Sequence, residues 1–401
     1  MELIWAVLTS TIGNLIFIVI GIQAIYLLIF AVAGLFYSEK RKPDQPKLHK
    51  FIIYIPSYKE DEVILDTAQK SLQIDYPIDL YHVVIIADSL KKETIDQLKT
   101  LPLQVVEVKF EKSTKAKALN KALDVSPSGY DYAIVFDADN VAKEDYLKEM
   151  NIAFTSGIKV VQGQRTAKNK NNELAILDGI SEGINNHIFR KGHRSLGLSS
   201  AIIGSAMGLE FKLYERVMRQ LTAVGGFDKE MELYLLKNKI RVGYAQNAIV
   251  YDEKIQQAAV LENQRKRWLS AQVTYLKKHF GSGITQLLTK GNIDYFDKVF
   301  QMAVIPRVIL IGILPVLWLI SFIHGNAPAP SFWFGILLIG YFAILISIPR
   351  QFVNKELFLA ILKLPTSIFT MFKLLFKLKG ANKTFIHTPH GTISENKEEK
   401  K

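Results

Sequence analysis

A long apolar run near the start of the chain restricts the fold more than any other feature of the sequence. Residues 15–37 carry no charged side chain, and a run of this length can cross a hydrocarbon core of about 30 Å as a helix. Lipid offers backbone groups no hydrogen-bond partners, so a single spanning segment must be helical. A cleaved signal peptide is the alternative, but the run is longer than a signal core and lacks a preceding basic region and a cleavage site. We expect a transmembrane anchor over residues 1–40.

Two further apolar stretches lie near the other end of the chain. Residues 302–323 and 332–348 are separated by a polar segment that contains two prolines. Their lengths suit two spanning helices, which predicts a transmembrane hairpin over residues 299–350. Residues 351–385 mix apolar side chains with lysines, as an amphipathic segment at a membrane interface does. The polar residues 386–401 predict a disordered tail.

Basic residues at the ends of the apolar runs predict the orientation of the chain in the membrane. They follow the first run, precede the second and follow the third: Lys40, Arg41, Lys42, Lys298, Arg350 and Lys355. Cytosolic loops carry an excess of such residues. We therefore expect a multi-pass protein of the cell membrane whose central domain, residues 41–298, faces the cytosol.

Composition excludes several classes of protein. With 49% hydrophobic and 22% charged residues, the chain is not predominantly disordered. The net charge of +12 would suit nucleic acid, anionic lipid or a phosphorylated substrate. Because the lysines are scattered and no known nucleic-acid module appears, we expect no nucleic-acid partner. The absence of cysteine excludes disulfides, thiolate metal sites and a cysteine nucleophile.

Strands alternate with helices in the first half of the predicted cytosolic domain. The expected strands are 51–55, 82–87, 105–110 and 132–136, and the expected helices are about 61–72, 93–100 and 116–123. This alternation is typical of βαβ units and a parallel sheet, so we expect an α/β, Rossmann-like domain. Ligands of open α/β sheets bind beyond the carboxyl ends of the strands. The residues that follow each strand are therefore the candidates for a site.

Acidic residues follow three of these strands. Glu60 follows the first, Asp88 the second, and Asp137 and Asp139 the fourth. Carboxylates would repel an acidic ligand such as a nucleoside diphosphate unless Mg²⁺ or Mn²⁺ bridged them, and both ions prefer oxygen ligands. Turn-forming aspartates are the alternative reading of the Asp-x-Asp pair.

Basic and polar residues begin the next helix. Lys115 precedes it and Asn120 lies within it. A lysine at the start of a helix can meet a phosphate group. A solvated basic face is the alternative, and we favour it for Lys117 and Lys121.

Acidic residues at 228–232 offer a general base. Asp228, Glu230 and Glu232 come just before a helical stretch, and one of them could take the proton from an acceptor hydroxyl. Favourable negative charge at a helix N-terminus is the alternative reading.

A basic and aromatic helix follows. Gln264, Arg267 and Trp268 share one helical face. The arginine could stabilise a departing diphosphate, and the indole could stack on a sugar ring. An interfacial helix with basic anchors is the alternative.

In this order, the motifs resemble membrane-bound, inverting family 2 glycosyltransferases. That group includes cellulose, chitin, hyaluronan and poly-N-acetylglucosamine synthases and ceramide glucosyltransferase, and the resemblance covers about residues 51–275. It implies a GT-A fold in which the donor-binding residues are Pro56, Tyr58, Glu60, Asp88, Lys115, Asn120 and Asp137. It implies metal binding by Asp139 and Asp137. It implies catalytic roles for Glu230, Glu232, Gln264, Arg267 and Trp268.

Two positions depart from the pattern of that group. Where its members usually carry Glu-Asp, with the aspartate as base, this chain has Lys229-Glu230. Glutamate can perform the same proton transfer, so Glu230 is the expected base and Glu232 the second choice. Lys59 stands where asparagine is frequent in the first motif.

The resemblance implies an inverting hexosyltransferase that uses a nucleotide-sugar, with a UDP-sugar as the first expectation. It would build a polysaccharide processively or glycosylate a membrane-associated acceptor. Transfer of one sugar to a lipid is nearly as well supported, because three predicted spans offer little material for a polymer channel. An oligomer or an accessory membrane subunit could supply more. A non-catalytic membrane scaffold and a transporter are the alternatives from other classes.

Overall fold

The structure is a computed structural model that describes residues 2–39, 46–222, 225–323 and 328–375. Their Cα positions divide into two compact units. The helical unit contains the described residues up to 38, 176–200 and those from 272 onward. The sheet unit contains the described residues of 39–175 and 201–271. The predicted tail 386–401, the last part of the predicted interfacial segment and residues 40–45 lie outside the described ranges.

One sheet of eight strands forms among the described residues of the sheet unit, in the order β3-β2-β1-β4-β7-β6-β8-β5. The strands are β1 Phe51–Tyr58, β2 Tyr81–Asp88, β3 Gln104–Val108, β4 Tyr132–Val135, β5 Val141–Ala142, β6 Val160–Ala167, β7 Met207–Glu210 and β8 Val242–Asp252. All four strands expected from the alternating pattern are present.

The sheet is mixed, whereas the sequence predicts a parallel one. Strands β3, β2, β1 and β4 run parallel as expected. Strand β7 is antiparallel to both β4 and β6, and β5 is antiparallel to β8. A four-residue strand such as β7 gives almost no periodic signal, and it follows an irregular segment. The fold class is therefore confirmed for the α/β domain, with a correction of the sheet from parallel to mixed.

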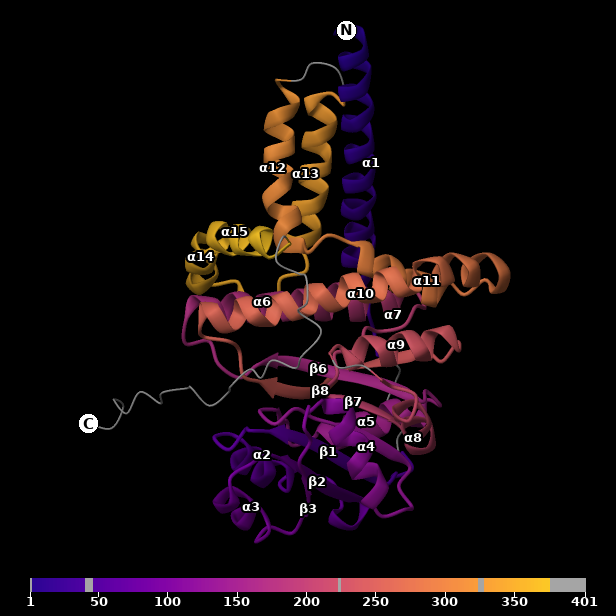
Figure 1. The fold of residues 1–401 in the computed structure, drawn as a ribbon, viewed down its shortest axis with the longest axis vertical. Helices are drawn as coiled ribbons and strands as arrows, with labels where there is room; N and C mark the ends of the chain where they lie inside the picture. The colour runs from indigo at the N-terminus through magenta and orange to yellow at the C-terminus, as the bar shows by residue number, and fades with distance from the viewer. Residues whose placement is uncertain (1, 40–45, 223–224, 324–327, 376–401) are drawn as a thin grey trace, which may run out of the picture. The chain divides into compact units, whose positions relative to one another are not determined.

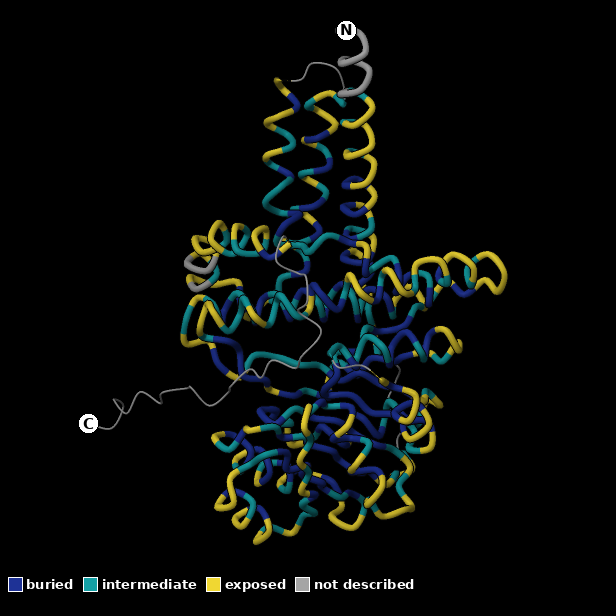
Figure 2. Tube along the Cα trace, viewed as in Figure 1, coloured by how far each residue is buried: buried dark blue, intermediate teal, exposed yellow. Residues whose placement is uncertain are grey.

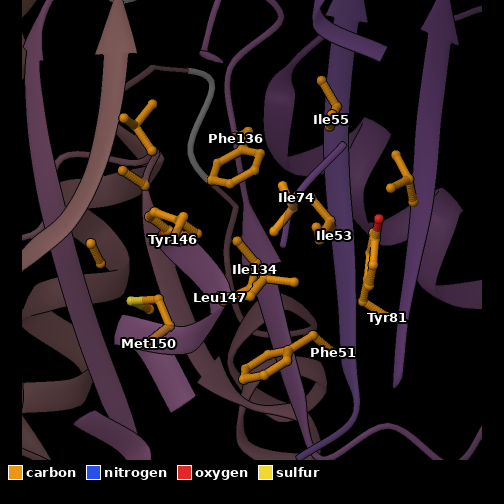
Figure 3. Packing of buried hydrophobic residues seen from close by; sticks show 14 of the residues in the cluster. Phe51, Ile53, Ile55, Ile74, Tyr81, Ile134, Phe136, Tyr146, Leu147 and Met150 are labelled. Atoms are coloured by element: carbon orange, nitrogen blue, oxygen red, sulfur yellow. The ribbon is translucent and has the colours of Figure 1, made fainter. Parts of the chain in front are cut away.

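Helices cover both faces of the sheet. They are α2 Ile64–Ser71, α3 Lys92–Leu98, α4 Lys115–Val125, α5 Tyr146–Thr155, α8 Phe211–Met218 and α9 Phe227–Lys237, with a short 3-10 turn at Ile78–Leu80. On one face, Phe51, Ile134 and Met150 pack in the core shown in Figure 3. On the other, Tyr54 stacks on Tyr214 of α8. Because both faces are covered, the central strands are apolar throughout, and they appear dark blue in Figure 2.

The helical unit is built around three helices that lie side by side, α1, α12 and α13 (Figure 1). Its elements are α1 Glu2–Leu35, η2 Asn186–Gly192, α7 His193–Ser195, α11 Ile293–Ala303, α12 Arg307–Ser321, α13 Pro330–Leu345, η3 Arg350–Phe352, α14 Lys355–Leu362 and α15 Leu364–Leu375. Helices α6 Glu173–Asn185 and α10 Ala258–Lys290 pass from one unit into the other.

One helix among the described residues is long and apolar enough to cross a membrane by itself, namely Ser10–Leu35 within α1. This confirms the predicted N-terminal apolar helix. Helices α11 and α12 pass the same test only as a pair, with a bend of 61° between them. Helix α13, at 16 residues, falls short. Where the sequence predicts a hairpin of two spanning helices, the described residues form a bent apolar pair followed by a shorter apolar helix.

The bend between α11 and α12 has a local cause. Pro306 disfavours helical geometry in the residue before it and has no N–H of its own. The amide of Ile305 instead donates to Gln23 Oε1 of α1 at 2.7 Å. Gln23 is buried and is the polar interruption of the first apolar run. Helix α12 begins at Arg307, whose guanidinium donates to Asn185 Oδ1 and the carbonyl of Ser181.

Candidate active site

The carboxyl ends of β1 and β2 meet in two strained turns. Tyr58 lies opposite Asp88 in the strand register, and Lys59 N donates to the carbonyl of Asp88 at 3.1 Å. Lys59 and Ser89, the residues that follow each strand, have φ values of 57° and 59°. Residues with side chains rarely adopt this conformation, and it clusters at functional sites.

These turns bring together the first group of predicted residues. Glu60 and Asp88 are both buried, and Ser89 Oγ donates to Asp88 Oδ1 at 3.0 Å. The carbonyl of Glu60 accepts hydrogen bonds from the amides of Val63 and Ile64 at the start of α2, and these bonds fix the turn. Pro56 and Tyr58 lie on β1 beside them, half-buried, and the Lys59 ammonium lies 5.3 Å from the centre of the Tyr58 ring. The structure thus places Pro56, Tyr58, Glu60 and Asp88 at one edge of the sheet.

The Asp-Ala-Asp motif forms a tight turn after β4 that is organised by the next residue, Asn140. Asp137 N donates to Asn140 Oδ1 at 3.1 Å. The Asn140 amide group donates to Asp139 Oδ1 at 3.2 Å and to Asp252 Oδ1 at 3.1 Å. Asn140 is fully buried. Asp139 is 3% exposed, and its Oδ2 accepts from the amide of Glu253 at 3.0 Å.

The end of β8 therefore belongs to this site, and the sequence analysis missed it. Asp252, Glu253 and Lys254 follow the same pattern that identified the other strand ends, an apolar strand that ends in charged residues. That signal could have found them. β8 pairs in parallel with β6, and Arg165 of β6 reaches the same rim.

Positive side chains alternate with the carboxylates of this rim. The Lys115 ammonium pairs with Asp137. Arg165 lies between two aspartates, with Nη1 3.9 Å from Asp137 Oδ2 and Nε 3.6 Å from Asp252 Oδ2. The buried Lys254 donates to Asp252 Oδ2 at 2.7 Å. Asp137 thus lies beside Lys115 and Arg165, and Asp139 accepts from the amides of Asn140 and Glu253.

This donor set fits a divalent cation that binds together with a diphosphate. Among the described residues, no group of three or more His, Cys, Asp or Glu side chains is arranged to hold a metal ion alone. Mg²⁺ and related ions in phosphate sites usually use one or two carboxylates and take their remaining ligands from water and phosphate oxygens. Asp139 and Asp137 supply hard oxygen atoms of that kind.

Lys115 is the first residue of α4 and joins several parts of the site. Besides Asp137, its ammonium donates to the carbonyl of Gly204 at 2.8 Å and lies 5.2 Å from the centre of the Phe227 ring. The helix N-terminus adds its own positive partial charge at this point. Asn120, one turn further along α4, instead donates to the carbonyl of Met218 at 3.0 Å. The structure therefore joins Lys115 to the carboxylates and ties Asn120 to the end of α8.

The three acidic residues of α9 have different surroundings. Glu232 is buried and accepts from the amide of Ile202 at 3.0 Å. Glu230 is half-buried and accepts from the amide of Thr222 at 3.0 Å. Asp228 packs against the loop that receives Lys115, since a Cβ added at Gly204 would lie 3.2 Å from Asp228 Cβ.

Gln264, Arg267 and Trp268 lie on α10, as the spacing predicts. The Gln264 Oε1 atom is buried without a hydrogen-bond partner among the described residues. Burial lowers the pKa of the Arg267 guanidinium from its ordinary value. Trp268 is 40% exposed, and the guanidinium of Arg265 lies 4.7 Å from its ring centre. The Arg265 guanidinium thus covers one face of the indole.

Comparison with known proteins supports the fold. The chain is similar to the solved mannosyltransferase PcManGT from Pyrobaculum calidifontis in complex with GDP-Man and Mn²⁺, with 16% identity and a TM-score of 0.56 over 90% of this chain and 98% of that one. Glucosyl-3-phosphoglycerate synthase from Mycobacterium tuberculosis matches with 12% identity and a TM-score of 0.37 over 53% of this chain and 72% of that one. That score is too low to support an argument. No curated protein sequence gives a significant match.

The first similarity shows a GT-A-like domain, as the sequence predicts. A sequence model described as glycosyltransferase like family 2 matches residues 49–271, which is more than half of the chain. The protein therefore belongs to glycosyltransferase family 2 and is a nucleotide-sugar-dependent glycosyltransferase.

Proposed function

We propose that this enzyme transfers a hexose from a UDP-sugar, with inversion, to an acceptor at the membrane surface. The observation that carries the proposal is the rim of the sheet, where Asp137, Asp139, Lys115 and Arg165 alternate in charge. A diphosphate bound with a divalent cation needs both signs of charge side by side. A rim of carboxylates alone would repel it, and a rim of lysines alone would need no metal.

Asp139 and Asp137 would hold Mg²⁺ or Mn²⁺ in this proposal. A bound divalent cation would neutralise charge on the diphosphate and so improve it as a leaving group. Lys115 and Arg165 both lie beside the Asp137 carboxylate. They would offer charge-assisted hydrogen bonds to the oxygen atoms of a diphosphate bound there. The presence of GDP-Man and Mn²⁺ in the similar mannosyltransferase supports this use of the rim.

The uracil and ribose would bind at the neighbouring strand ends. Asp88 and Glu60 are buried acceptors there, and Pro56 and Tyr58 present apolar surface beside them. A planar base suits such an edge, because one side can stack while the carboxylate accepts from its N–H group.

Transfer would proceed by a single displacement. The acceptor oxygen forms a bond to the anomeric carbon while the bond from that carbon to the phosphate oxygen breaks. The proton of the acceptor hydroxyl passes to Glu230, with Glu232 as the second candidate. Arg267 would stabilise the departing diphosphate, with Gln264 and Trp268 beside it on α10 facing the acceptor.

The acceptor would be a lipid or a growing polysaccharide. The apolar helix α1 and the bent pair α11 and α12 support an enzyme that is held in a bilayer and so meets membrane-associated acceptors. Membranes that contain the full chain, incubated with labelled UDP- and GDP-sugars, distinguish the two acceptors. A ladder of products indicates processive synthesis, and one lipid-extractable product indicates transfer of a single sugar.

The metal role is tested with Asp139→Asn. We expect this variant to lose Mn²⁺-dependent release of nucleoside diphosphate, because an amide is a much poorer ligand for a divalent cation than a carboxylate. Asp79→Asn is the matched control, since Asp79 is exposed on the turn before β2. Full activity of Asp139→Asn would refute the assignment. Absence of release by the wild-type chain with every common UDP- and GDP-sugar would instead favour a scaffold role.

A further inference from the structure

A buried set of hydrogen bonds joins the turn after β4 to the end of β8. Its centre is Asn140, whose amide group donates to Asp139 at 3.2 Å and to Asp252 at 3.1 Å. The oxygen of the same side chain accepts from Asp137 N at 3.1 Å. Asn140 is fully buried, and 112 positions of sequence separate it from Asp252. One side chain thus organises the whole Asp-Ala-Asp turn and fixes it to a distant strand.

The chemistry of the amide suits this position. Asparagine has two N–H donors and one acceptor oxygen, and all three functions are used here. The two donors meet two carboxylates that would otherwise repel each other in a medium of low dielectric constant. Serine has one hydrogen to donate, and aspartate would add a third negative charge. The residue type therefore matches the task of holding two carboxylates in fixed positions.

Both oxygen atoms of Asp139 are oriented by this arrangement. Asn140 donates to Oδ1, and the amide of Glu253 donates to Oδ2 at 3.0 Å. Asp252 is in turn held by Lys254 at 2.7 Å. These contacts fix the direction of the Asp139 carboxylate. Hydrogen-bond partners behind a metal ligand fix its orientation, and their removal weakens binding of the ion.

We propose that Asn140 and Asp252 are positioning residues that hold Asp139 in the geometry needed to bind the divalent cation. They act through Asp139 and touch neither the donor nor the acceptor. The inference rests on the proposed role of Asp139 as a metal ligand. It assigns a function to the end of β8, which carries none in the proposed mechanism.

Binding of Mn²⁺ by the purified full chain tests the proposal without any acceptor. Free Mn²⁺ is measured by electron paramagnetic resonance during titration in the presence of UDP, and in parallel with GDP. Changes in second partners of a metal ligand typically weaken binding about 10- to 100-fold, and we expect a loss in this range for Asn140→Ala. Asn238→Ala is the matched control, because Asn238 lies at the end of α9 and donates to the carbonyl of Tyr234. We expect it to bind as wild type does.

Two variants of Asp252 separate positioning from direct coordination. Asn in place of Asp252 keeps an oxygen that can accept from Asn140, so Asp252→Asn should bind Mn²⁺ nearly as wild type does. Asp252→Ala removes that oxygen and should lose as much affinity as Asn140→Ala. This pair also keeps the proposal testable if Asn140→Ala does not fold.

Three outcomes would overturn the inference. Unchanged Mn²⁺ affinity in folded Asn140→Ala would show that the hydrogen bonds serve stability alone. An equal loss in Asp252→Asn and Asp252→Ala would make Asp252 a metal ligand. If wild type binds no Mn²⁺ with either nucleotide, the proposed metal role itself fails, and the inference falls with it.

Discussion

The two aspartates of the Asp-Ala-Asp motif have the same chemistry and different partners. Asp137 pairs with Lys115 and lies near Arg165, whereas Asp139 accepts from the amides of Asn140 and Glu253. Buried amide donors orient both oxygen atoms of Asp139, and we propose Asp139 as the principal ligand of the metal. Asp137 lies beside Lys115 and Arg165, the cations that we propose for the diphosphate.

Glutamine in place of Glu230 tests the general base. Loss of a positioned base typically costs about 10²- to 10⁴-fold in rate, and we expect Glu230→Gln to lose transfer in this range. UDP binding should stay unchanged, because Glu230 contacts Thr222 in the loop before α9. Donor affinity and turnover are measured separately on the same preparation.

Two further variants of α9 distinguish Glu230 from the other candidate bases. Glu232→Gln keeps an oxygen that accepts from the amide of Ile202, so it should keep the fold, and a loss of transfer in this variant with Glu230→Gln active would move the base to Glu232. Asp228 lies against the loop that binds Lys115. A loss confined to Asp228→Asn, with Glu230→Gln active, would move the base to Asp228.

At the residue scale, the sequence predicted the carboxylates better than their partners. Glu60, Asp88, Asp137 and Asp139 each end a clear apolar strand, so their places follow from strand topology. The partnership of Asn140 with Asp252 depends on the antiparallel pairing of β5 with β8, in which Val141 lies opposite Tyr251, and no local pattern reveals that pairing. The contact of Asn120 with the carbonyl of Met218 likewise depends on the packing of α4 against α8, which the sequence pattern does not reveal.

At the scale of elements, α1 and η2 pack unusually closely. A Cβ added at Gly192 would lie 2.1 Å from the carbonyl oxygen of Phe30, which real contacts do not allow. The Phe30 ring also stacks on His193 with centroids 3.6 Å apart. The short distance requires a residue without a side chain at position 192.

Alanine in place of Gly192 should therefore destabilise the protein. Forcing extra atoms into a packed interior typically costs about 1–3 kcal/mol. We expect a lower unfolding temperature for Gly192→Ala in detergent, measured by the intrinsic fluorescence of tryptophan. The control is Gly281→Ala in α10, where an added Cβ meets nothing within 4 Å. Equal unfolding temperatures in the two variants would contradict the packing argument.

Elements with a strong period were predictable, and short or irregular ones were not. The strands β1, β2, β3 and β4 were all expected from apolar runs between helices. The π-helical segment η2 and the four-residue strand β7 carry no pattern that distinguishes them from a loop. Their places are set by tertiary contacts with α1 and with β4 and β6.

At the scale of the whole molecule, α1 presents large apolar side chains at its surface. Leu15, Ile18, Val19 and Ile22 are each at least 50% exposed. An exposed apolar surface of this kind in water would favour aggregation, whereas lipid would accept it. We expect the chain to remain in the membrane fraction after washing with alkaline carbonate and to enter solution only with detergent. Release by carbonate alone would contradict membrane insertion.

The division into two units has a consequence for any attempt to shorten the chain. The backbone passes from one unit to the other after residues 38, 175, 200 and 271. A fragment from 39 to 271 would therefore still carry the stretch 176–200, whose buried side chains, such as Ile188 and His193, would lose the helices that cover them. Truncation at the two ends therefore cannot isolate the sheet unit, because residues 176–200 of the helical unit lie between its two sequence segments.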